Sequence, residues 1–364
     1  MDSKDNAESG KVIKSFHLIE DSEKKAILED VSGKTGMPPF AVEKDWWVTQ
    51  ALRILYSMEI GKHLVFKGGT SLSKGWGLIE RFSEDIDLAV DREFLGFDGE
   101  LSNTQISKLR KAAHKYITET LAPELEAKFK EYGLDKVEFK VIETNESDQD
   151  PSIIEIYYET VIGSPSYIEN RVQIEIGCRS LHEPFTTQPI TALVDHYYPD
   201  FEFTMPAFDV PIVNPERTFL EKIFLLHEEF HKPKEKIRIN RLSRHLYDVF
   251  QLSRSKYAAI VLEDKGLYET IVKHRHSYTR VGGVDYNSHQ PKTVDPFPKD
   301  EIIDDWRKDY LTMQEQMIFG ESPSFDEMIK AIEDFIVQLK KVDWKVNHEF
   351  LPPAHQIQHK ASTK

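Results

Sequence analysis

The sequence predicts an α+β fold, in which a mixed β-sheet core lies between N-terminal helices and a mainly helical C-terminal domain. Apolar residues recur at helical spacing before residue 60, strand-like and helix-like segments alternate between residues 61 and 180, and helical spacing returns beyond Glu216. Strands mixed with helices and then followed by a run of helices are typical of this fold class.

The N-terminal segment, residues 1–60, is expected to be helical from about residue 11. Its clearest helix extends from Phe40 to Ile54, because this stretch has an apolar face and follows Pro38-Pro39, which marks a helix start. The core, residues 61–180, should contain a long helix from about residue 103 to 131. Its strands are predicted near residues 64–67, 85–90, 137–142, 152–160 and 169–176.

The C-terminal domain is predicted to span residues 181–351. Its first part, residues 181–214, is expected to be irregular because prolines occur throughout it. A loop is expected from Arg280 to Pro298, and the polar tail, residues 352–364, is expected to be disordered. Helices are predicted over residues 216–231, 241–252, 255–263, 300–317 and 325–341.

The composition bounds the class of protein. The 364 residues contain no run of 18 apolar residues, so no membrane span is expected, and the polar N-terminus lacks the apolar core of a signal peptide. The single cysteine, Cys178, cannot form an internal disulfide, which fits a reducing, cytoplasmic location. The net charge of −15 is not that of a protein that coats nucleic acid, although local basic stretches can still bind RNA.

The most informative stretch is Lys67–Val90, which reads KGGTSLSKGWGLIERFSEDIDLAV. Asp85 and Asp87 alternate with apolar residues, so in a strand their side chains would share one face. Two neighbouring carboxylates repel each other unless a cation lies between them, and oxygen ligands suit Mg²⁺. We therefore interpret both aspartates as metal ligands; the alternative is a pair of exposed strand residues that bind nothing.

A glycine pair precedes these aspartates. Gly69 lies 16 residues before Asp85, after a short apolar strand and before a helix-like segment. Backbone N–H groups at such a junction can bind phosphate. We expect the nucleotide-binding loop to comprise Lys67, Gly68, Gly69, Thr70 and Ser71, with an ordinary tight turn as the alternative. The glycine pair and the aspartate pair in this order predict a magnesium–nucleotide site.

This arrangement resembles the nucleotidyltransferase superfamily, which has a polymerase-beta-like fold. Within it, KGGTSLSK followed by RFSEDIDL is similar to the AbiEii/MenT group, the toxins of type IV toxin–antitoxin systems of abortive infection. The similarity covers roughly residues 40 to 335, in the order of the family. It also includes the segments Val42–Trp46, Pro215–Lys222 and Arg244–Asp248, and the residues Trp306, Asp309, Tyr310 and Met313.

The resemblance implies further site residues. A third carboxylate on a neighbouring strand would complete the metal site, and Glu175, in an alternating segment, matches it, with Glu155 as a rival. Lys222 would contact the nucleotide phosphates; the alternative is a lysine whose stem packs beside an apolar helix stripe. Asp248 would be a further active-site residue.

The resemblance also implies an activity. The chain would use two Mg²⁺ ions to transfer a nucleoside monophosphate from an NTP to an RNA acceptor, such as the 3′ end of a tRNA, and would be restrained by a cognate antitoxin. Two alternatives stay open. The acceptor could be a protein hydroxyl or a small molecule, or the protein could bind a nucleotide and a partner without turnover. The oligomeric state and the preferred base are not predicted.

Two basic stretches could contact an RNA acceptor, and solvated loops are the alternative for both. The first supplies Lys236, Arg238, Arg241 and Arg244, and the second extends from Val272 to Arg280. Ser83, two residues before Asp85, is a candidate regulatory residue, because a phosphate there would repel an NTP. Its alternative role is to cap a turn.

Overall fold

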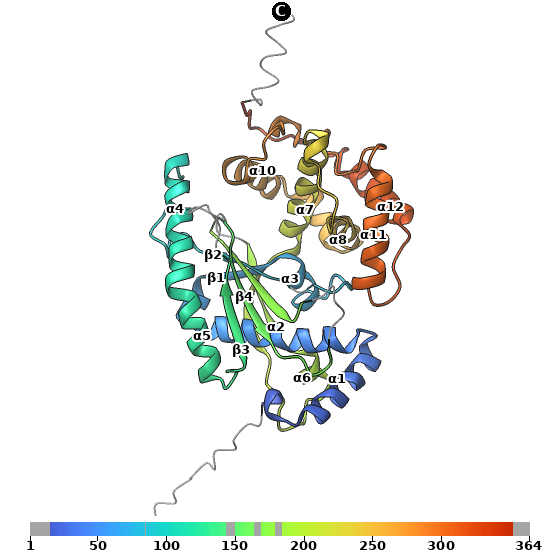
Figure 1. Cartoon of the computed structure of the whole chain (residues 1–364). Coiled ribbons are helices and arrows are strands. Elements are labelled where there is room, and N and C mark those ends of the chain that lie inside the picture. Colours follow the sequence, from blue (N-terminus) through green and yellow to red (C-terminus); the bar gives the residue numbers. More distant parts are fainter. Residues whose placement is uncertain (1–14, 84, 143–149, 164–168, 179–183, 352–364) are drawn as a thin grey trace, which may run out of the picture.

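The computed structural model describes residues 15–83, 85–142, 150–163, 169–178 and 184–351, so the predicted disordered tail lies outside the described residues. A seven-stranded sheet occupies the middle of the molecule. Helices α1, α2 and α6 lie below it in Figure 1, α4 and α5 flank it, and the helices from α7 onward lie above it. The predicted α+β class is confirmed.

The N-terminal helices begin and end where local chemistry demands it. Helix α1, Asp21–Thr35, stops at Gly36, which has a left-handed φ of 72°. Helix α2, Pro39–Ser57, begins with proline at its first position, where the missing N–H costs nothing. Its apolar side chains pack under the sheet, which confirms the helix predicted around Phe40–Ile54.

The long helix predicted near residues 103–131 is present, with one irregular turn. Helix α4, Asn103–Tyr116, begins with a capping box in which Ser102 and Gln105 bond reciprocally. A π-helical turn, Ile117–Leu121, then leads into α5, Ala122–Glu131. The whole unit packs through Leu109, Ile117, Leu125 and other buried side chains onto the sheet cluster.

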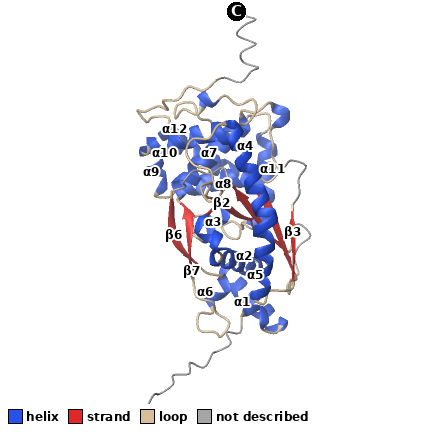
Figure 2. Cartoon of the chain, turned by 90° about the vertical axis from the view of Figure 1, so that its left-hand side faces the viewer, coloured by secondary structure: helices blue, strands red, loops and turns tan. Residues whose placement is uncertain are grey.

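The sheet has the order β3-β4-β5-β2-β1-β7-β6, and Figure 2 shows β3 and β6 at its two edges. Neighbouring strands are antiparallel except for the pairs β2–β5 and β1–β7. The strands are β1 Leu64–Lys67, β2 Asp85–Val90, β3 Val137–Val141, β4 Ser152–Tyr158, β5 Arg171–Gly177, β6 Phe185–Ile190 and β7 Phe208–Val213.

The prediction that residues 181–214 are irregular is wrong for most of the described part of that stretch. It contains β6, helix α6 (Leu193–Tyr197) and β7, so the sheet extends beyond residue 180. Pro189 is tolerated because β6 is an edge strand. Pro211 is tolerated in β7 because the pairing of that strand with β1 is confined to Phe66 and Ile212.

The helices beyond residue 214 form the second layer. They are α7 Pro215–Phe230, α8 Ser243–Ser253, α9 Tyr257–Glu263, α10 Lys265–His274, α11 Ile303–Met317 and α12 Phe325–Leu339. The five predicted helices are present, and α10 is an addition. The short helix α3, Gly68–Lys74, follows β1 directly. The predicted loop at residues 280–298 contains only a short 3₁₀ turn, Tyr286–Ser288.

Two groups of buried apolar residues divide the chain roughly as the sequence predicts. One surrounds the sheet with α1, α2, α4 and α5, and the other lies among the helices from α7 onward. The boundary between domains stays a proposal, and we move it from residue 180 to the end of β7. Among the described residues, no helix has the length and apolarity that a bilayer crossing requires.

Candidate active site

The aspartates of β2 and the glutamate of β5 lie on one face of two adjacent strands. Ile86 and Leu88 are fully buried in the sheet cluster, so Asp85 and Asp87 point to the other face. In the parallel pairing of β2 with β5, Asp87 lies directly opposite Glu175. Three carboxylates are therefore brought together from residues 90 positions apart.

These carboxylates raise one another's affinity for protons. Burial, with the charges of Glu175 and Asp85, raises the pKa of Asp87 to about 7. Burial and the charge of Asp85 also raise the pKa of Glu175. Three acidic oxygen donors that resist sharing negative charge are a chemical fit for a hard divalent cation. In the described part of the chain, however, no three His, Cys, Asp or Glu side chains converge closely enough to form a finished ligand set.

Two glycines allow the loop after β1 to approach these acids. A Cβ on Gly68, whose φ is +79°, would lie 1.9 Å from Oδ2 of Asp87. A Cβ on Gly69 would lie 2.8 Å from Oγ of Ser83. The next residue, Thr70, is buried and donates its hydroxyl to the Asp85 carbonyl at 2.5 Å. The glycine pair is thus required by contact with the acidic strand, not merely by a turn.

A buried trio of charges faces the acids. Arg81 donates Nε and Nη2 to the two oxygens of Asp248, each at 2.7 Å, and Nζ of Lys222 lies 2.8 Å from Oδ2 of Asp248. Although burial alone would raise it, the pKa of Asp248 lies below its ordinary value because of these two cations. One carboxylate between two cations leaves a net positive charge beside the acidic strand.

Acids, glycines and cations line one cavity of about 210 Å³. It lies between strands β1, β2 and β5 of the sheet and helices α7 and α8, and is open to solvent. Its walls are Lys67, Gly68, Gly69, Arg81, Ser83, Asp85, Asp87, Glu175, Thr218, Glu221, Lys222, Leu225, Arg244, His245 and Arg275. Such a chamber can hold a polyanion between its cations and place it beside the three carboxylates.

Comparison with known proteins identifies the family. The family described as "Nucleotidyl transferase AbiEii toxin, Type IV TA system" matches residues 51–334. The chain belongs to this family. It is therefore a nucleotidyltransferase toxin of the AbiEii type, and the predicted resemblance is confirmed. Toxins of such systems are paired with a cognate antitoxin.

Two solved structures are similar to this chain, and the first of them has a similar fold. MenT4, the nucleotidyltransferase toxin Rv2826c from Mycobacterium tuberculosis H37Rv, is 18% identical, with a TM-score of 0.50 over 88% of this chain and 90% of that one. JHP933 from Helicobacter pylori is 14% identical, with a TM-score of 0.42 over 88% of this chain and 97% of that one. No curated protein matches the chain in sequence.

The structure of this AbiEii-family chain separates Glu175 from its rival. Glu155 lies opposite Gln173 on the far side of β5, where it accepts the hydroxyl of Tyr157 at 2.8 Å and pairs with Arg171 at 2.9 Å. It does not line the catalytic cavity, whereas Glu175 does. Glu155 is thus already compensated by a cation of its own, and Glu175 is the third carboxylate available to the cavity.

The residues expected to bind nucleotide or RNA do not all reach the cavity. Lys67, Gly68 and Gly69 line it, while Thr70 and Ser71 are buried behind it. Asp248 does not line it either, but holds Lys222 and Arg81 there.

Of the four basic residues proposed for RNA, Arg244 lines the cavity, with Nη1 3.9 Å from Asp85. Arg238 is held by Glu229, which accepts its backbone N–H at 2.7 Å and Nη2 at 2.8 Å. Lys236 ends an exposed 3₁₀ turn, and Arg241 lies near the start of α8.

Several cavity residues were not predicted from the sequence. Three of them lie on α7 at helical spacing from the predicted Lys222, namely Thr218, Glu221 and Leu225. The helical period counted from Lys222 could have found these neighbours. His245 was quoted only as part of a motif; burial and nearby Lys222 hold its pKa well below the ordinary value, so it is neutral. No local pattern indicates Arg275, because it reaches the cavity only through the packing of α10.

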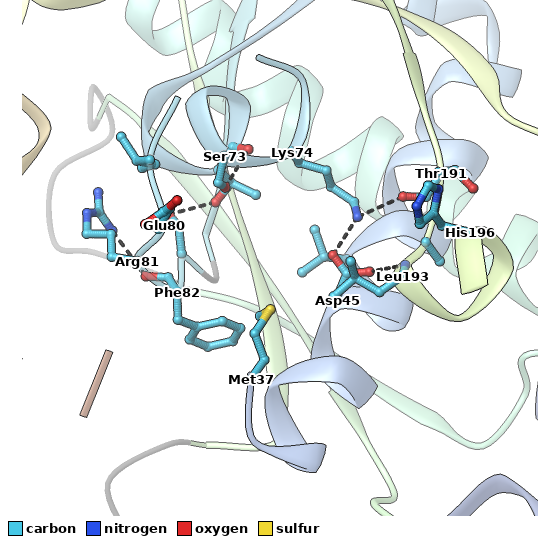
Figure 3. A pocket seen from close by; sticks show the side chains of 15 residues that line it. Met37, Asp45, Ser73, Lys74, Glu80, Arg81, Phe82, Thr191, Leu193 and His196 are labelled. Carbon is cyan, nitrogen blue, oxygen red and sulfur yellow. Dashed lines mark hydrogen bonds and ion pairs between the residues drawn. The ribbon is translucent and has the colours of Figure 1, made fainter. Parts of the chain in front are cut away.

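A second cavity, of about 300 Å³, lies behind the first, and Arg81 and Ser83 line both. Figure 3 shows its polar side, where Nζ of Lys74 pairs with Asp45 at 2.5 Å and donates to the Thr191 carbonyl at 3.0 Å. Its other walls include apolar side chains such as Met37 and Phe82. Asp45 and Lys74 of this second cavity therefore neutralise each other.

Proposed function

We propose that this toxin transfers a nucleoside monophosphate from an NTP to a hydroxyl of an RNA acceptor, with Mg²⁺ as cofactor, and that the acceptor is the 3′ end of a tRNA. Loss of a free tRNA 3′ end blocks translation, which accounts for toxicity. The observation that carries the proposal is the placement of Asp85, Asp87 and Glu175 opposite Lys222 across one cavity.

The carboxylates of Asp85, Asp87 and Glu175 would hold the two metal ions. The raised pKa values of Asp87 and Glu175, which follow from burial and neighbouring acids, are the expected property of such a set. The chemistry that Mg²⁺ supplies at this position is activation of the attacking hydroxyl and neutralisation of the phosphate oxygens.

The protein's own groups bind and orient the NTP. Gly68 and Gly69 let the triphosphate approach the backbone, and the Lys222 ammonium, fixed by Asp248, faces charge that develops on the leaving pyrophosphate. In the reaction the acceptor oxygen bonds to the α-phosphorus, the bond from that phosphorus to the bridging oxygen breaks, and pyrophosphate departs. The hydroxyl proton passes to solvent.

Arg244 is the residue best placed to meet the acceptor. Its side chain is 30% exposed, lies beside Asp85, and has an Nε without a hydrogen-bond partner among the described residues. Local positive charge of this kind can bind RNA despite the net charge of −15. A cytoplasmic location agrees with the single cysteine, which is buried and free.

The deciding experiment incubates the protein with Mg²⁺, total RNA and each NTP labelled at the α-phosphate. We expect label in RNA of tRNA size. Asp87→Ala should lower transfer by more than about 10²–10³-fold, since a metal ligand contributes at least as much as one electrostatic donor. Glu155→Gln is the matched control, because this glutamate faces Arg171 and not the cavity.

The outcomes separate the competing functions. Label in protein or in a small molecule would replace the RNA acceptor by another hydroxyl. No label with any NTP, from protein that binds NTP, would indicate a nucleotide-binding partner protein without turnover. Activity in folded Asp87→Ala at saturating Mg²⁺ would show that the metal site is wrongly assigned.

The proposed RNA contact has its own test. Charge reversal of Lys236 and Arg241 should weaken acceptor binding and reduce its salt dependence by roughly one slope unit for each lost phosphate contact, while NTP affinity stays constant. Arg238, also proposed, should be changed separately, because its reversal would place a like charge beside buried Glu229. An unchanged salt slope would mean that these side chains only solvate the surface.

A further inference from the structure

Arg275 enters the catalytic cavity from an element that carries no recognised motif. It begins the π-helical turn Arg275–Thr279 that continues α10, and its side chain is 13% exposed. It shares the cavity with Lys67, Lys222 and Arg244. The cavity therefore receives a cation from a third helix, in addition to those from α7 and α8.

A buried glutamate fixes the orientation of this arginine. Glu228, on α7, accepts Nε of Arg275 at 2.8 Å and Nη2 at 2.5 Å, so two parallel bonds define the plane of the guanidinium. The Glu228 side chain is 2% exposed. Although burial opposes it, the charge of Arg275 lowers the pKa of Glu228 to about 2, so the pair is ionised at neutral pH.

The glutamate is itself held in place. His289 lies 3.2 Å from Oε1 of Glu228 through Nε2, and its ring stacks against Tyr286 with centroids 4.6 Å apart and an interplanar angle of 1°. Burial lowers the pKa of His289, so the ring is neutral and donates from Nε2. The loop after α10 thus anchors Glu228, and Glu228 anchors Arg275.

The arrangement leaves donors to spare. A guanidinium carries five N–H bonds, and Glu228 uses two of them; among the described residues Arg275 has no other hydrogen-bond acceptor. Burying an ion pair of this kind rarely stabilises a fold over apolar packing, because desolvation offsets the attraction. A costly pair whose arginine lines a cavity and keeps unused donors is better explained by recognition of an anion.

We propose that Arg275 is a phosphate-binding residue of the catalytic cavity and that Glu228 is its positioning residue. The proposal rests on the proposed function, which supplies two phosphate-bearing substrates, the NTP and the RNA end. A planar, preoriented fork matches two oxygens of one phosphate group, a role that a flexible lysine fills poorly. Arg275 would act with Lys222 from a different helix.

Binding of NTP without RNA is the central test, because it does not depend on turnover. Isothermal titration with each NTP and Mg²⁺ would compare wild type with Arg275→Lys and with the double variant Arg275→Met, Glu228→Gln, which leaves no unpaired buried charge. We expect both to bind the preferred NTP roughly 10- to 100-fold more weakly. Lys273→Ala, an exposed α10 residue paired with Glu100, is the control and should bind normally.

A second arm uses RNA without NTP. Unchanged NTP affinity with a tenfold or greater loss of tRNA affinity would overturn NTP as the source of the phosphate and assign Arg275 to the acceptor. Unchanged affinity for both ligands in the folded variants would overturn the proposal. Glu228→Gln alone leaves the Arg275 charge without its carboxylate, so it should lower the melting temperature and also weaken NTP binding per folded molecule; full NTP affinity of the folded protein would refute the positioning role of Glu228.

The two proposals fail in distinguishable ways. If wild type binds NTP and Arg275→Lys does not, but no acceptor is ever labelled, the phosphate-binding role of Arg275 is supported and the proposed transfer reaction is refuted. If RNA is labelled equally by wild type and Arg275→Lys at limiting NTP, the transfer reaction stands and the role of Arg275 falls.

Discussion

Replacing Lys222 should remove activity with little loss of stability, whereas replacing its partner Asp248 should strongly destabilise the protein. Asp248 is completely buried between two cations, and its two bonds to Arg81 do not need Lys222. Lys222→Met keeps the packed stem and leaves a neutral Arg81–Asp248 pair, so we expect a cost of about 1 kcal/mol. Asp248→Ala leaves two buried cations uncompensated, at a cost of about 3–5 kcal/mol.

Lys222→Met should reduce the rate of nucleotide transfer far more than it reduces stability. Without its ammonium, Lys222→Met loses the charge that faces the pyrophosphate, and turnover per folded molecule should fall about 10²–10³-fold. Urea unfolding followed by tryptophan fluorescence gives the stability, and labelled-NTP transfer gives the rate. Equal destabilisation by the two variants, or wild-type transfer by Lys222→Met, would refute this account of the trio.

The same trio predicts the response to acid. The folded-state pKa of Asp248 lies below its ordinary value of 3.8, because Arg81 and Lys222 outweigh the effect of burial. Its stabilising contribution is therefore complete above pH 3.8 and is lost as the pH falls below that value. Asp248→Asn should show a shallower loss of stability than wild type in urea unfolding as the pH falls below 3.8.

Three further predictions concern the cavity. Asp87→Asn should raise the melting temperature of metal-free protein at pH 8 but not at pH 4. The reason is that the pKa of Asp87 is about 7 in the folded protein, so its ionisation reduces stability as the pH rises above 3.8. Mg²⁺ should then stabilise only wild type, and equal responses of the two proteins to Mg²⁺ would contradict this prediction. Gly68→Ala should abolish transfer, because the new Cβ would collide with the side chain of Asp87. The control is Gly96→Ala, which has a similar φ of +83° and open space around it, and should only be slightly less stable. Equal losses of activity in the two variants would show that the collision with Asp87 is not the cause. If phosphorylation of Ser83 is the switch, Ser83→Asp should be inactive, and Ser83→Ala should be active but no longer restrained by the antitoxin. Normal growth of cells that express both Ser83→Ala and the antitoxin would rule this switch out.

The acidic strand was predictable because alternation alone fixes which side chains share a face. Because Asp85 and Asp87 alternate with the buried residues Ile86 and Leu88, only one orientation of the two faces of β2 is possible. The neighbour of that strand was not predictable in the same way. Asp87 meets Glu175 through a parallel pairing across 88 residues, and only similarity to a family favoured Glu175 over Glu155.

The errors arose where tertiary packing overrides a local signal. Prolines normally exclude strands, yet Pro189 and Pro211 lie in β6 and β7, where the missing N–H groups face an edge or a short pairing. The local run of positive charge also did not reveal that Arg238 pairs with Glu229, a buried residue of α7. A one-dimensional pattern cannot show that a glutamate is buried or that an arginine already has its counterion.

The segment that leads into the acidic strand is held by backbone bonds to residues at the end of helix α11, far later in the sequence. Arg81 forms a β-bridge with Ile318, and the Phe82 N–H donates to the Met317 carbonyl at 2.6 Å. Chains are made from the N-terminus, so the carboxylates leave the ribosome well before the residues that fix the approach to them. A nascent chain therefore cannot complete the backbone bonds of Arg81 and Phe82 until Met317 and Ile318 have been synthesised, so the approach to the acidic strand is fixed long after that strand itself is made.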